Sequence, residues 1–492
     1  MKRFSLYCLF LVNVQITIGQ QSYSTPNNFF DLRKQILSNI KNETVQFNEP
    51  EDEKDNAMAK FKRWEQFMLP RVGPKGVMFN SDAVYKAYNN YYAQNKTLFN
   101  INPWSAIGPF YDPPSGPYYG TRVGVGRVNC IAQHPLDSQT LYIGSMGGGI
   151  WKTINGGQSW TCLDNQLPSM SISDIAINPI HPDTMYIATG DAIGNYTITS
   201  NPNFHQGHYS CGVLMSTNGG LSWQPTGFTY EQYQTENIYR MIIDPIQPHH
   251  LLLGCDKGLF RSTNSGNSWT QLDTTRTYDL LINPLDATKY YALTNNSQKL
   301  KRSYDGGASF KIVNLTNLVG ASTLGHIRIS AADTSKIYVL RGAGQLIRSD
   351  NGGKSFKTIN NLSNPFFHQG NYDKAFALSP VDTSIALIGL VDLVKTTNTS
   401  KTYVKVDSIE SPTKGIHVDF HSLQFSIFNP STIYAANDGG IYVSHDVGET
   451  WNSLNNGLNI TQYYKLNTSN LKPNSIIAGA QDNCLTVQIG LQ

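Results

Sequence analysis

A short motif that recurs seven times along the chain constrains its fold more than any other feature. Its pattern is Ser/Thr-x-Asp/Asn-x-Gly-x-Ser/Thr followed by an aromatic residue, as in TINGGQSW at 153–160. One copy, TTNTSKTY at 396–403, has Ser400 in place of the glycine. Successive copies lie 41 to 63 residues apart, a period typical of proteins built from repeated structural units. The Asp/Asn position is occupied by Asn155, Asn218, Asn264, Asp305, Asn351, Asn398 and Asp446.

The residues before each motif predict two short strands joined by a turn. In SDIAINPIHPDTMYIATG at 173–190, two apolar runs flank a turn that is rich in Asn, Pro and Asp. With one strand before the motif and one after it, each unit has four short antiparallel strands, which is typical of a β-propeller blade. We therefore expect an all-β fold, a propeller of seven or eight four-stranded blades.

The sequence leaves the blade number open, because eight strand pairs accompany seven motifs. The last pair, at about 463–478, has no motif after it. In one interpretation the strand WSAI at 104–107 completes an eighth blade and closes the ring, which removes exposed sheet edges. In the other, the chain is a piece of a longer protein.

The motif itself is expected to be the hairpin turn between the third and fourth strands of a blade. Asn155 can accept backbone N–H groups in such a turn, and Gly157 supplies a positive φ. The motif lacks the final bidentate Glu of a Ca²⁺ loop and the Lys-Ser/Thr of a phosphate-binding loop. The seven Asp/Asn residues are therefore predicted to be structural.

The residues before the propeller differ in kind. A basic start and an apolar run predict a cleaved signal peptide at 1–19, so the protein is expected to be secreted or at the cell surface, with no membrane segment after cleavage. Residues 20–100 have helical apolar spacing and predict a helical segment or spacer. The propeller is assigned to 101–492.

Charge and cysteine content exclude some classes of partner. The formal net charge is only +3 and there is no basic stripe, which argues against a nucleic-acid partner. The six cysteines form no CxxC pair, which argues against a zinc cluster, and no disulfide pairing can be assigned. No cofactor is indicated.

Ligands are expected on the face opposite the motif turns, where the loops between second and third strands and the crossovers between blades lie. Three carboxylates in such loops are candidate catalytic residues: Asp191, Asp438 and Asp482. Six further residues are candidates for ligand binding: Arg127, Tyr372, Asp373, His417, Asp419 and His421.

The segment HVDFH at 417–421 suggests a further interpretation. Alternate residues of an extended segment point the same way, so His417, Asp419 and His421 could converge. They are weak candidates for metal ligands, with another ligand role or a structural cluster as alternatives. Sialidase chemistry is disfavoured, because no Arg-Ile-Pro motif precedes the repeats.

The motif resembles the Asp-box, or BNR, repeats of sialidases, xyloglucanase-type endoglucanases and sortilin-type propellers. Over roughly 60–483 the chain resembles a family of secreted bacterial Asp-box proteins. The resemblance implies a propeller fold without a defined reaction, and relatives that usually continue into a sorting domain for export. It is carried by KFKRWEQFMLPRV (60–72), GRVNCIAQHP (126–135), NDGGIYVS (437–444), LNNGLNITQYYKL (454–466) and AGAQDN (478–483).

Taken together, these features predict a propeller that binds an extracellular polysaccharide or protein at its loop-rich face. A first alternative is a xyloglucanase-like glycoside hydrolase that uses two carboxylates at the central channel. A second alternative is a sortilin-like peptide-binding or adhesion module.

Overall fold

The described part of the chain falls into two units. The computed structural model describes 28–42, 72–77, 108–112 and 124–489, a few isolated positions between 61 and 106, and within the last range it has gaps at 166, 193–209, 231–235, 295–298, 316–324, 342–344, 362–372, 399–402, 408–415, 469–470, 472–474 and 484. One unit comprises Met1–Asn102 and Thr197–Gln206, and the other comprises Pro103–Tyr196 and Gly207–Gln492.

The first unit contains helix α2 (Phe29–Asn42). Asn28 caps it, because its side-chain oxygen accepts a hydrogen bond from the backbone N–H of Phe30 at 2.9 Å. Asp31 places a negative charge in the first turn, where the helix dipole favours it. No helix in the described ranges is long and apolar enough to cross a membrane. The predicted signal peptide at 1–19 lies outside the described residues.

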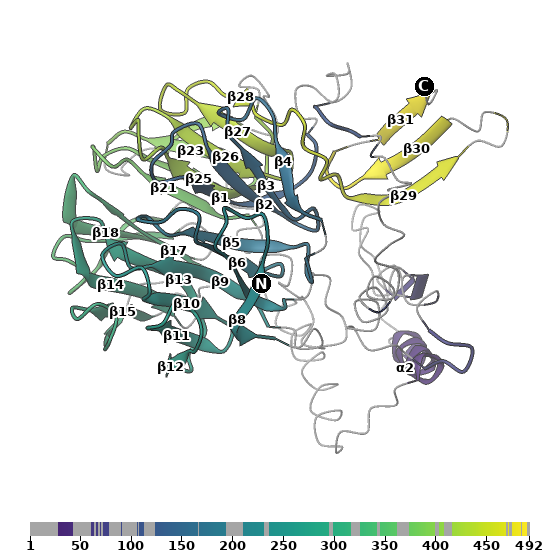
Figure 1. Ribbon diagram of the computed structural model, residues 1–492, viewed down its shortest axis with the longest axis horizontal. Helices are drawn as coiled ribbons and strands as arrows, with labels where there is room; N and C mark the ends of the chain where they lie inside the picture. The colour runs from purple at the N-terminus through teal and green to yellow at the C-terminus, as the bar shows by residue number, and fades with distance from the viewer. Residues whose placement is uncertain are drawn as a thin grey trace. The chain divides into compact units, whose positions relative to one another are not determined.

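The second unit contains seven antiparallel sheets, each made of four consecutive strands (Figure 1). In the first blade, burial falls from β1 and β2 to the outermost strand β4, as expected if the inner strands pack around the axis and the outer edge meets solvent. The first three blades are β1 (Val128–Gln133), β2 (Leu141–Ser145), β3 (Ile150–Thr153), β4 (Thr161–Asp164); β5 (Ile172–Ile177), β6 (Met185–Thr189), β7 (Gly212–Ser216), β8 (Gln224–Thr229); and β9 (Ile238–Ile243), β10 (Leu251–Cys255), β11 (Gly258–Ser262), β12 (Thr270–Asp273).

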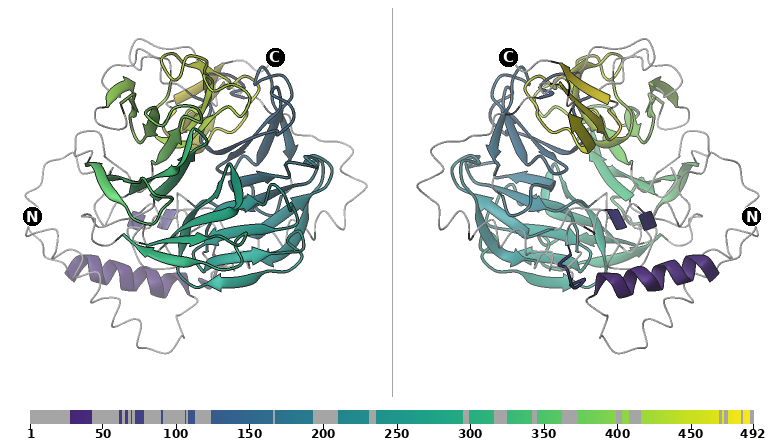
Figure 2. Two further views of the ribbon diagram at one scale, coloured as in Figure 1. Left: turned by 90° about the vertical axis from the view of Figure 1, so that its left-hand side faces the viewer. Right: turned by 90° about the vertical axis from the view of Figure 1, so that its right-hand side faces the viewer.

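The remaining four blades repeat this order, and Figure 2 shows the sheets from two sides. They are β13 (Thr277–Asn283), β14 (Asp286–Thr294), β15 (Lys299–Ser303), β16 (Lys311–Asn314); β17 (Gly325–Ser330), β18 (Asp333–Arg341), β19 (Gln345–Ser349), β20 (Lys357–Asn361); β21 (Ala375–Leu378), β22 (Ala386–Gly389), β23 (Leu393–Thr396), β24 (Val404–Asp407); and β25 (Phe420–Phe425), β26 (Ile433–Asn437), β27 (Gly440–Ser444), β28 (Asn452–Ser453).

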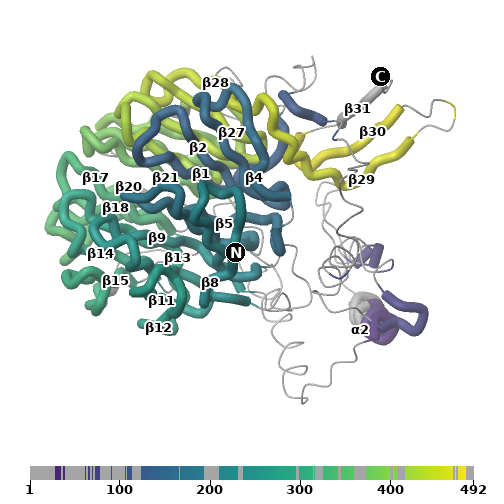
Figure 3. The backbone as a smooth tube through the Cα atoms, viewed as in Figure 1, coloured from purple at the N-terminus to yellow at the C-terminus, as the bar shows by residue number. Residues whose placement is uncertain are grey.

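Contacts between first strands close the blades into a ring of seven. Each first strand contacts that of the next blade, in the order β1, β5, β9, β13, β17, β21 and β25, and β25 and β26 contact β1. Figure 3 shows the last blade beside the first, although they lie at opposite ends of the repeat array. The all-β propeller is therefore confirmed, and of the two predicted blade numbers the ring has seven.

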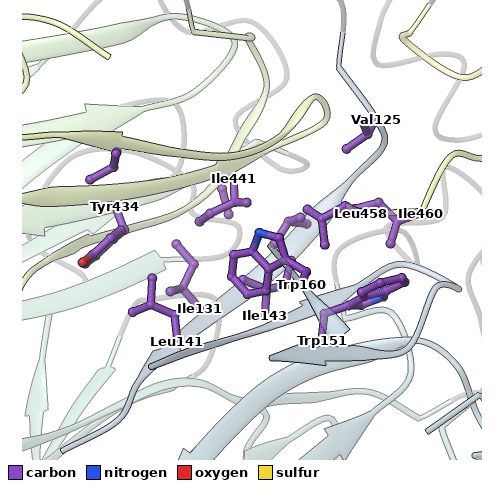
Figure 4. Packing of buried hydrophobic residues seen from close by; sticks show 13 residues of the cluster. Val125, Ile131, Leu141, Ile143, Trp151, Trp160, Tyr434, Ile441, Leu458 and Ile460 are labelled. Carbon is purple, nitrogen blue, oxygen red and sulfur yellow. The ribbon is translucent and has the colours of Figure 1, made fainter. Parts of the chain in front are cut away.

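A shared apolar core forms the seam where the ring closes. Ile131 and Leu141 of the first blade pack in one buried cluster with Tyr434 and Ile441 of the last (Figure 4). The eight-blade interpretation is wrong, and the segment WSAI at 104–107 on which it relied lies outside the described residues apart from Ala106. The first and seventh blades already contact each other, so no gap remains for another blade between them.

The eighth predicted strand pair exists but does not belong to the ring. Its strands are β29 (Tyr463–Thr468) and β30 (Ser475–Ala480), and β31 (Leu485–Ile489) pairs with β30 in a separate three-stranded sheet. Every residue of β29 is exposed, in contrast to the buried first strands of the blades.

The repeated motif forms the turn between the third and fourth strands. In the first copy, the Thr153 hydroxyl oxygen accepts the N–H of Gly157 at 3.0 Å, and the Asn155 side-chain oxygen accepts the N–H of Ser159 at 3.0 Å. Gly157 has φ 91°, a left-handed conformation that favours glycine. Each turn lies in its own blade, so these Asp and Asn residues do not share a pocket.

Candidate functional site

The motif turns mark one face of the propeller. The N–H of Gly156 donates to the carbonyl of Gln139, and the N–H of Gly219 donates to that of Asp183, so the motif turn packs on the turn between first and second strands of the same blade. The other end of each blade carries the loop between second and third strands and the crossover from the preceding blade. The candidate residues that the structure describes lie at that end.

Arg127, which directly precedes β1, binds Asp191, which follows β6 in the second blade. Its Nη2 lies 3.0 Å from Asp191 Oδ1, and its Nη1 lies 3.0 Å from the sulfur of Met146. Both charged side chains are almost fully buried. The pair joins the first two blades, because Arg127 belongs to one and Asp191 to the other. Removal of either side chain would leave the other as a buried charge without this partner. The predicted catalytic candidate Asp191 is therefore held in an ion pair.

Asp438 occupies the tight turn between β26 and β27 and binds His421 of β25. His421 Nε2 lies 2.6 Å from Asp438 Oδ1, and both side chains are buried. Burial opposes ionisation of the carboxyl, yet His421 and Arg127 outweigh it and lower the pKa of Asp438 to about 2. Burial, followed by Arg127, lowers the pKa of His421. Asp438 is thus held as a carboxylate by the His421 imidazole and a nearby guanidinium.

Asp373 and Asp419 are two further carboxyl groups close to Arg127 and Asp438, and with Asp191, Asp438 and Asp482 they make up the acidic group of this face. Asp373 lies just before β21 and is 0% exposed, and Asp419 lies just before β25 and is partly exposed. The two carboxyl groups lie close enough for each to influence the pKa of the other. Burial, followed by the negative charges nearby, raises the pKa of both carboxyl groups. The pair therefore holds a proton where isolated aspartates would be ionised.

Asp482 is the most exposed carboxyl of the group. It follows β30 and has φ 54°, as Asp419 has φ 64°, so both residues occupy left-handed backbone. Burial, followed by the charge of Asp438, raises the pKa of Asp482. Its carbonyl oxygen lies 3.2 Å from His417 Nε2, which ties the crossover before β25 to the loop after β30.

The expected convergence of His417, Asp419 and His421 is not found. The positive φ of Asp419 breaks the extended alternation on which that expectation rested. His417 contacts carbonyl oxygens and His421 contacts Asp438 instead. Within the described ranges no three His, Cys, Asp or Glu side chains are arranged to bind a metal ion. Tyr372 lies outside the described residues.

Asparagine amides that sequence reasoning missed support the site. Asn483 donates to the carbonyl of Asp438 at 2.9 Å and accepts the N–H of Gly124 at 2.8 Å. Asn437 donates to the carbonyl of His417 at 2.8 Å. Their position in ANDGG and AQDN, beside the candidate aspartates, was the available signal. These amides fix the backbone that carries Asp438 and Asp482.

The first strands of the middle blades carry a separate chain of ion pairs. Asp174 of β5 pairs with Arg240 of β9, and Asp279 of β13 pairs with Arg328 of β17 at 2.7 Å and lies 3.7 Å from Arg240. Despite burial, Arg328 and then His326 lower the pKa of Asp279. The alternation of acid and base on successive first strands is visible in the sequence. It explains Arg240 and Arg328 as partners of aspartates.

Comparison with known proteins identifies the type of propeller. No family model matches the chain. Curated proteins similar to it include xyloglucanase Xgh74A of Acetivibrio thermocellus, 25% identical over 266 residues, 45% of this chain and 30% of that protein. A xyloglucanase of Hypocrea jecorina is 21% identical over 67% of this chain and 39% of its own length.

Solved structures show the same likeness. The GH74 enzyme of Niastella koreensis matches with TM-score 0.56 and 17% identity, over 74% of this chain and 59% of that one. The GH74 xyloglucanase from Xanthomonas campestris matches with TM-score 0.56 and 16% identity, over 76% and 61%. The chain spans less than two thirds of each of these proteins. Its fold is that of a propeller related to the xyloglucanase type.

Proposed function

We propose that this chain is a glycoside hydrolase propeller that acts on a xyloglucan-like β-glucan at the face carrying Asp419 and Asp482. The observation that carries the proposal is that neighbouring aspartates on this face have pKa values shifted in opposite directions. Asp419 retains a proton beside Asp438, which stays ionised. The similarity to xyloglucanases supports the choice of substrate class.

The proposed chemistry needs one carboxyl group that donates a proton and a second that acts as base or nucleophile. Asp419 takes the role of general acid, because its pKa is raised and its side chain is partly exposed. Asp482 takes the role of second carboxylate, because it is the exposed member of the group. Asp438 is a buried carboxylate whose negative charge raises the pKa of both Asp419 and Asp482.

Glycan binding without cleavage is the second candidate. It is favoured by one observation: Asp191 and Asp438, two of the three carboxylates predicted to be catalytic, are buried in pairs with Arg127 and His421. In that case the same face binds the polysaccharide, and Asp419 and Asp482 donate or accept hydrogen bonds to sugar hydroxyls. A sortilin-like peptide-binding role has no comparable support.

Purified protein should be tested on xyloglucan, unsubstituted β-glucan and mannan, with both binding and release of reducing ends measured. Release from xyloglucan is expected, and Asp419→Asn or Asp482→Asn should lower its rate by about 100-fold or more. Asp382→Asn is a matched control, because Asp382 is exposed in a turn on the opposite face. Binding without release would favour the second candidate. Neither binding nor release on any of the three glycans would refute both.

The proposed substrate is a polymer outside the cell, so we also infer that the protein is secreted or held at the cell surface. The basic and apolar pattern of 1–19 and the resemblance to secreted Asp-box proteins support this inference. Detection of the protein with an antibody in the culture medium or on intact cells checks it. A wholly intracellular protein would contradict it.

A further inference from the structure

Three arginines at the loop-rich end of the third, fourth and fifth blades form ion pairs that share one orientation. In each pair the carboxylate is almost fully buried and the guanidinium side chain reaches solvent. The exposed fractions of the two side chains are 51% and 7% in Arg276–Asp256, 36% and 3% in Arg240–Asp174, and 24% and 3% in Arg328–Asp279. What these pairs expose is therefore guanidinium, although their charges balance.

This orientation is not a general consequence of long cationic side chains. In the ion pair of Lys395 with Glu449 the cation is 10% exposed and the carboxylate 59%. Arg348 and Asp350 show the same order, with 13% and 39%. Lys395 lies in β23 and Arg348 in β19, and both acid partners lie in motif turns. The exposed guanidinium groups are thus a local feature of the loop-rich face.

Asp256 fixes the most exposed of the three arginines. Its Oδ1 lies 2.8 Å from Arg276 Nε and also accepts the hydroxyl of Tyr239 at 2.8 Å. Its Oδ2 accepts the backbone N–H of Asn237 at 2.8 Å. The ion pair engages Nε, whereas the guanidinium carries its other N–H donors on the Nη groups. Because the carboxylate behind it is held in place, the Arg276 fork needs little ordering when it binds a second anion.

The three arginines belong to one continuous region. The ring centroids of Tyr239 and Tyr278 lie 5.0 Å apart. Each tyrosine is followed in the chain by a charged residue, Arg240 and Asp279 respectively. Asp279 lies 3.7 Å from Arg240 Nε and 2.7 Å from Arg328 Nη1. These contacts run from the crossover before β13 to β17, so the exposed guanidinium groups lie on neighbouring blades.

We propose that this region binds a carboxylate group of an acidic polysaccharide, such as that of a uronic acid residue, with Arg276 as the main contact and Arg240 beside it. A guanidinium and a carboxylate match through two parallel N–H···O hydrogen bonds. In the order of the ring, the third and fourth blades lie across the axis from the seventh, which Asp419 precedes. The choice of a polysaccharide rests on the function proposed above, whereas the preference for a carboxylate does not.

The test compares carboxymethyl cellulose with hydroxyethyl cellulose, which share a β-glucan backbone and differ in charge. Isothermal titration calorimetry of the wild type should show about tenfold tighter binding of the carboxymethyl polymer at low salt. The preference should decrease at high NaCl concentration, because salt screens an exposed charge contact.

Arg276→Gln should remove most of this preference and change the melting temperature little, since Asp256 keeps its other hydrogen-bond donors. Lys354→Gln is the matched control, because Lys354 is an exposed cation in a motif turn on the opposite face. If Arg276→Gln does not fold, Arg276→Lys tests the same contact, because it keeps the charge and loses the planar fork.

Equal binding of the two polymers by the wild type, or binding of neither, would overturn the proposal. So would a preference that Arg276→Gln retains, or an equal loss of both polymers in that variant. Cleavage of xyloglucan without any preference for the anionic polymer would refute this inference and leave the proposed hydrolase intact. A preference that Arg276→Gln removes, without cleavage of any glycan, would support the inference and count against hydrolysis.

Discussion

The acidic side chains on the loop-rich face have different neighbours, and the neighbours decide what each can do. Asp191 lies against a guanidinium and is fixed in an ion pair. Asp438 lies against an imidazole and stays ionised although it is buried. Asp419 lies against another carboxyl group and keeps a proton. Asp482 is a fourth aspartate on this face, and of the four only Asp419 and Asp482 reach solvent to a substantial degree, so we assign contact with the ligand to them.

The His421 imidazole is expected to contribute to stability as well as to the site. His421→Ala removes the partner of a buried carboxylate and should lower the free energy of unfolding by about 3–5 kcal/mol. His421→Gln keeps an N–H donor without a titrating ring and should lower it less.

Comparing the pH dependence of the wild type with that of His421→Gln separates the effect of protonating His421 from the effect of losing its hydrogen bond. Because burial lowers the pKa of His421, the unfolded chain binds a proton near pH 6.5 that the folded chain does not. Wild-type stability should therefore decrease as the pH falls below about 6.5, and that of His421→Gln should decrease less. Urea denaturation at pH 7, 6 and 5 checks this. Parallel decreases in both proteins would contradict it.

At the scale of the element, the same turn is built from interchangeable residues in the six copies of the motif that the structure describes in full. In the fourth copy Asp305 accepts the N–H of Ser309 at 2.9 Å, as Asn218 accepts the N–H of Ser222 at 3.0 Å in the second. Asn or Asp fits because the turn requires a short side chain with an acceptor oxygen. The repeat therefore specifies strand connections and leaves the chemistry of the opposite face free to vary.

The second copy of the motif gives a matched test of this structural role. Asn218→Ala leaves turn N–H groups without an acceptor and should lower the free energy of unfolding by about 1–3 kcal/mol. Asn218→Asp should have a smaller effect, because Asp305 already fills the equivalent place. Thermal denaturation and glycan binding should be measured together. Lost binding at normal stability would show that the turn belongs to a ligand site.

At the scale of the propeller, the ring closes through side chains because each described blade takes all four strands from one continuous stretch. Gln133 donates to the carbonyl of Phe425, and Gln424 donates to that of Ile131, across the seam between the first and last blades. Trp160 adds a hydrogen bond from its indole N–H to the carbonyl of Leu454 at 2.6 Å. These contacts join parts of the chain about 300 residues apart.

Trp160 and Trp269 provide a matched pair for testing the seam. The indole of Trp269 donates to Gly266 of its own motif, not across the seam. Trp160→Phe should increase hydrogen exchange in both β1 and β27, whereas Trp269→Phe should affect its own part of the ring. Hydrogen exchange followed by mass spectrometry checks this. Equal, local effects of the two substitutions would show that Trp160 does not hold the ring closed.

The sequence by itself determined the four-stranded build of each blade, because the turn motif and the strand pairs are local patterns set by residues close together in the chain. It also placed the candidate aspartates at the correct ends of their strands. The number of blades in the ring was decided only by packing, since the eighth strand pair is local evidence of strands and says nothing about where the first blade meets the last.

Only the tertiary structure decided which carboxyl groups meet. Arg127 and Asp191 are 64 residues apart, and Asp373 approaches Asp419 from another crossover, so no local pattern pairs them. Backbone conformation acted in the same way at Asp419, where a positive φ redirects a segment that reads as an extended strand. Ionisation depends on burial and on neighbours in space, and the folded ring sets both.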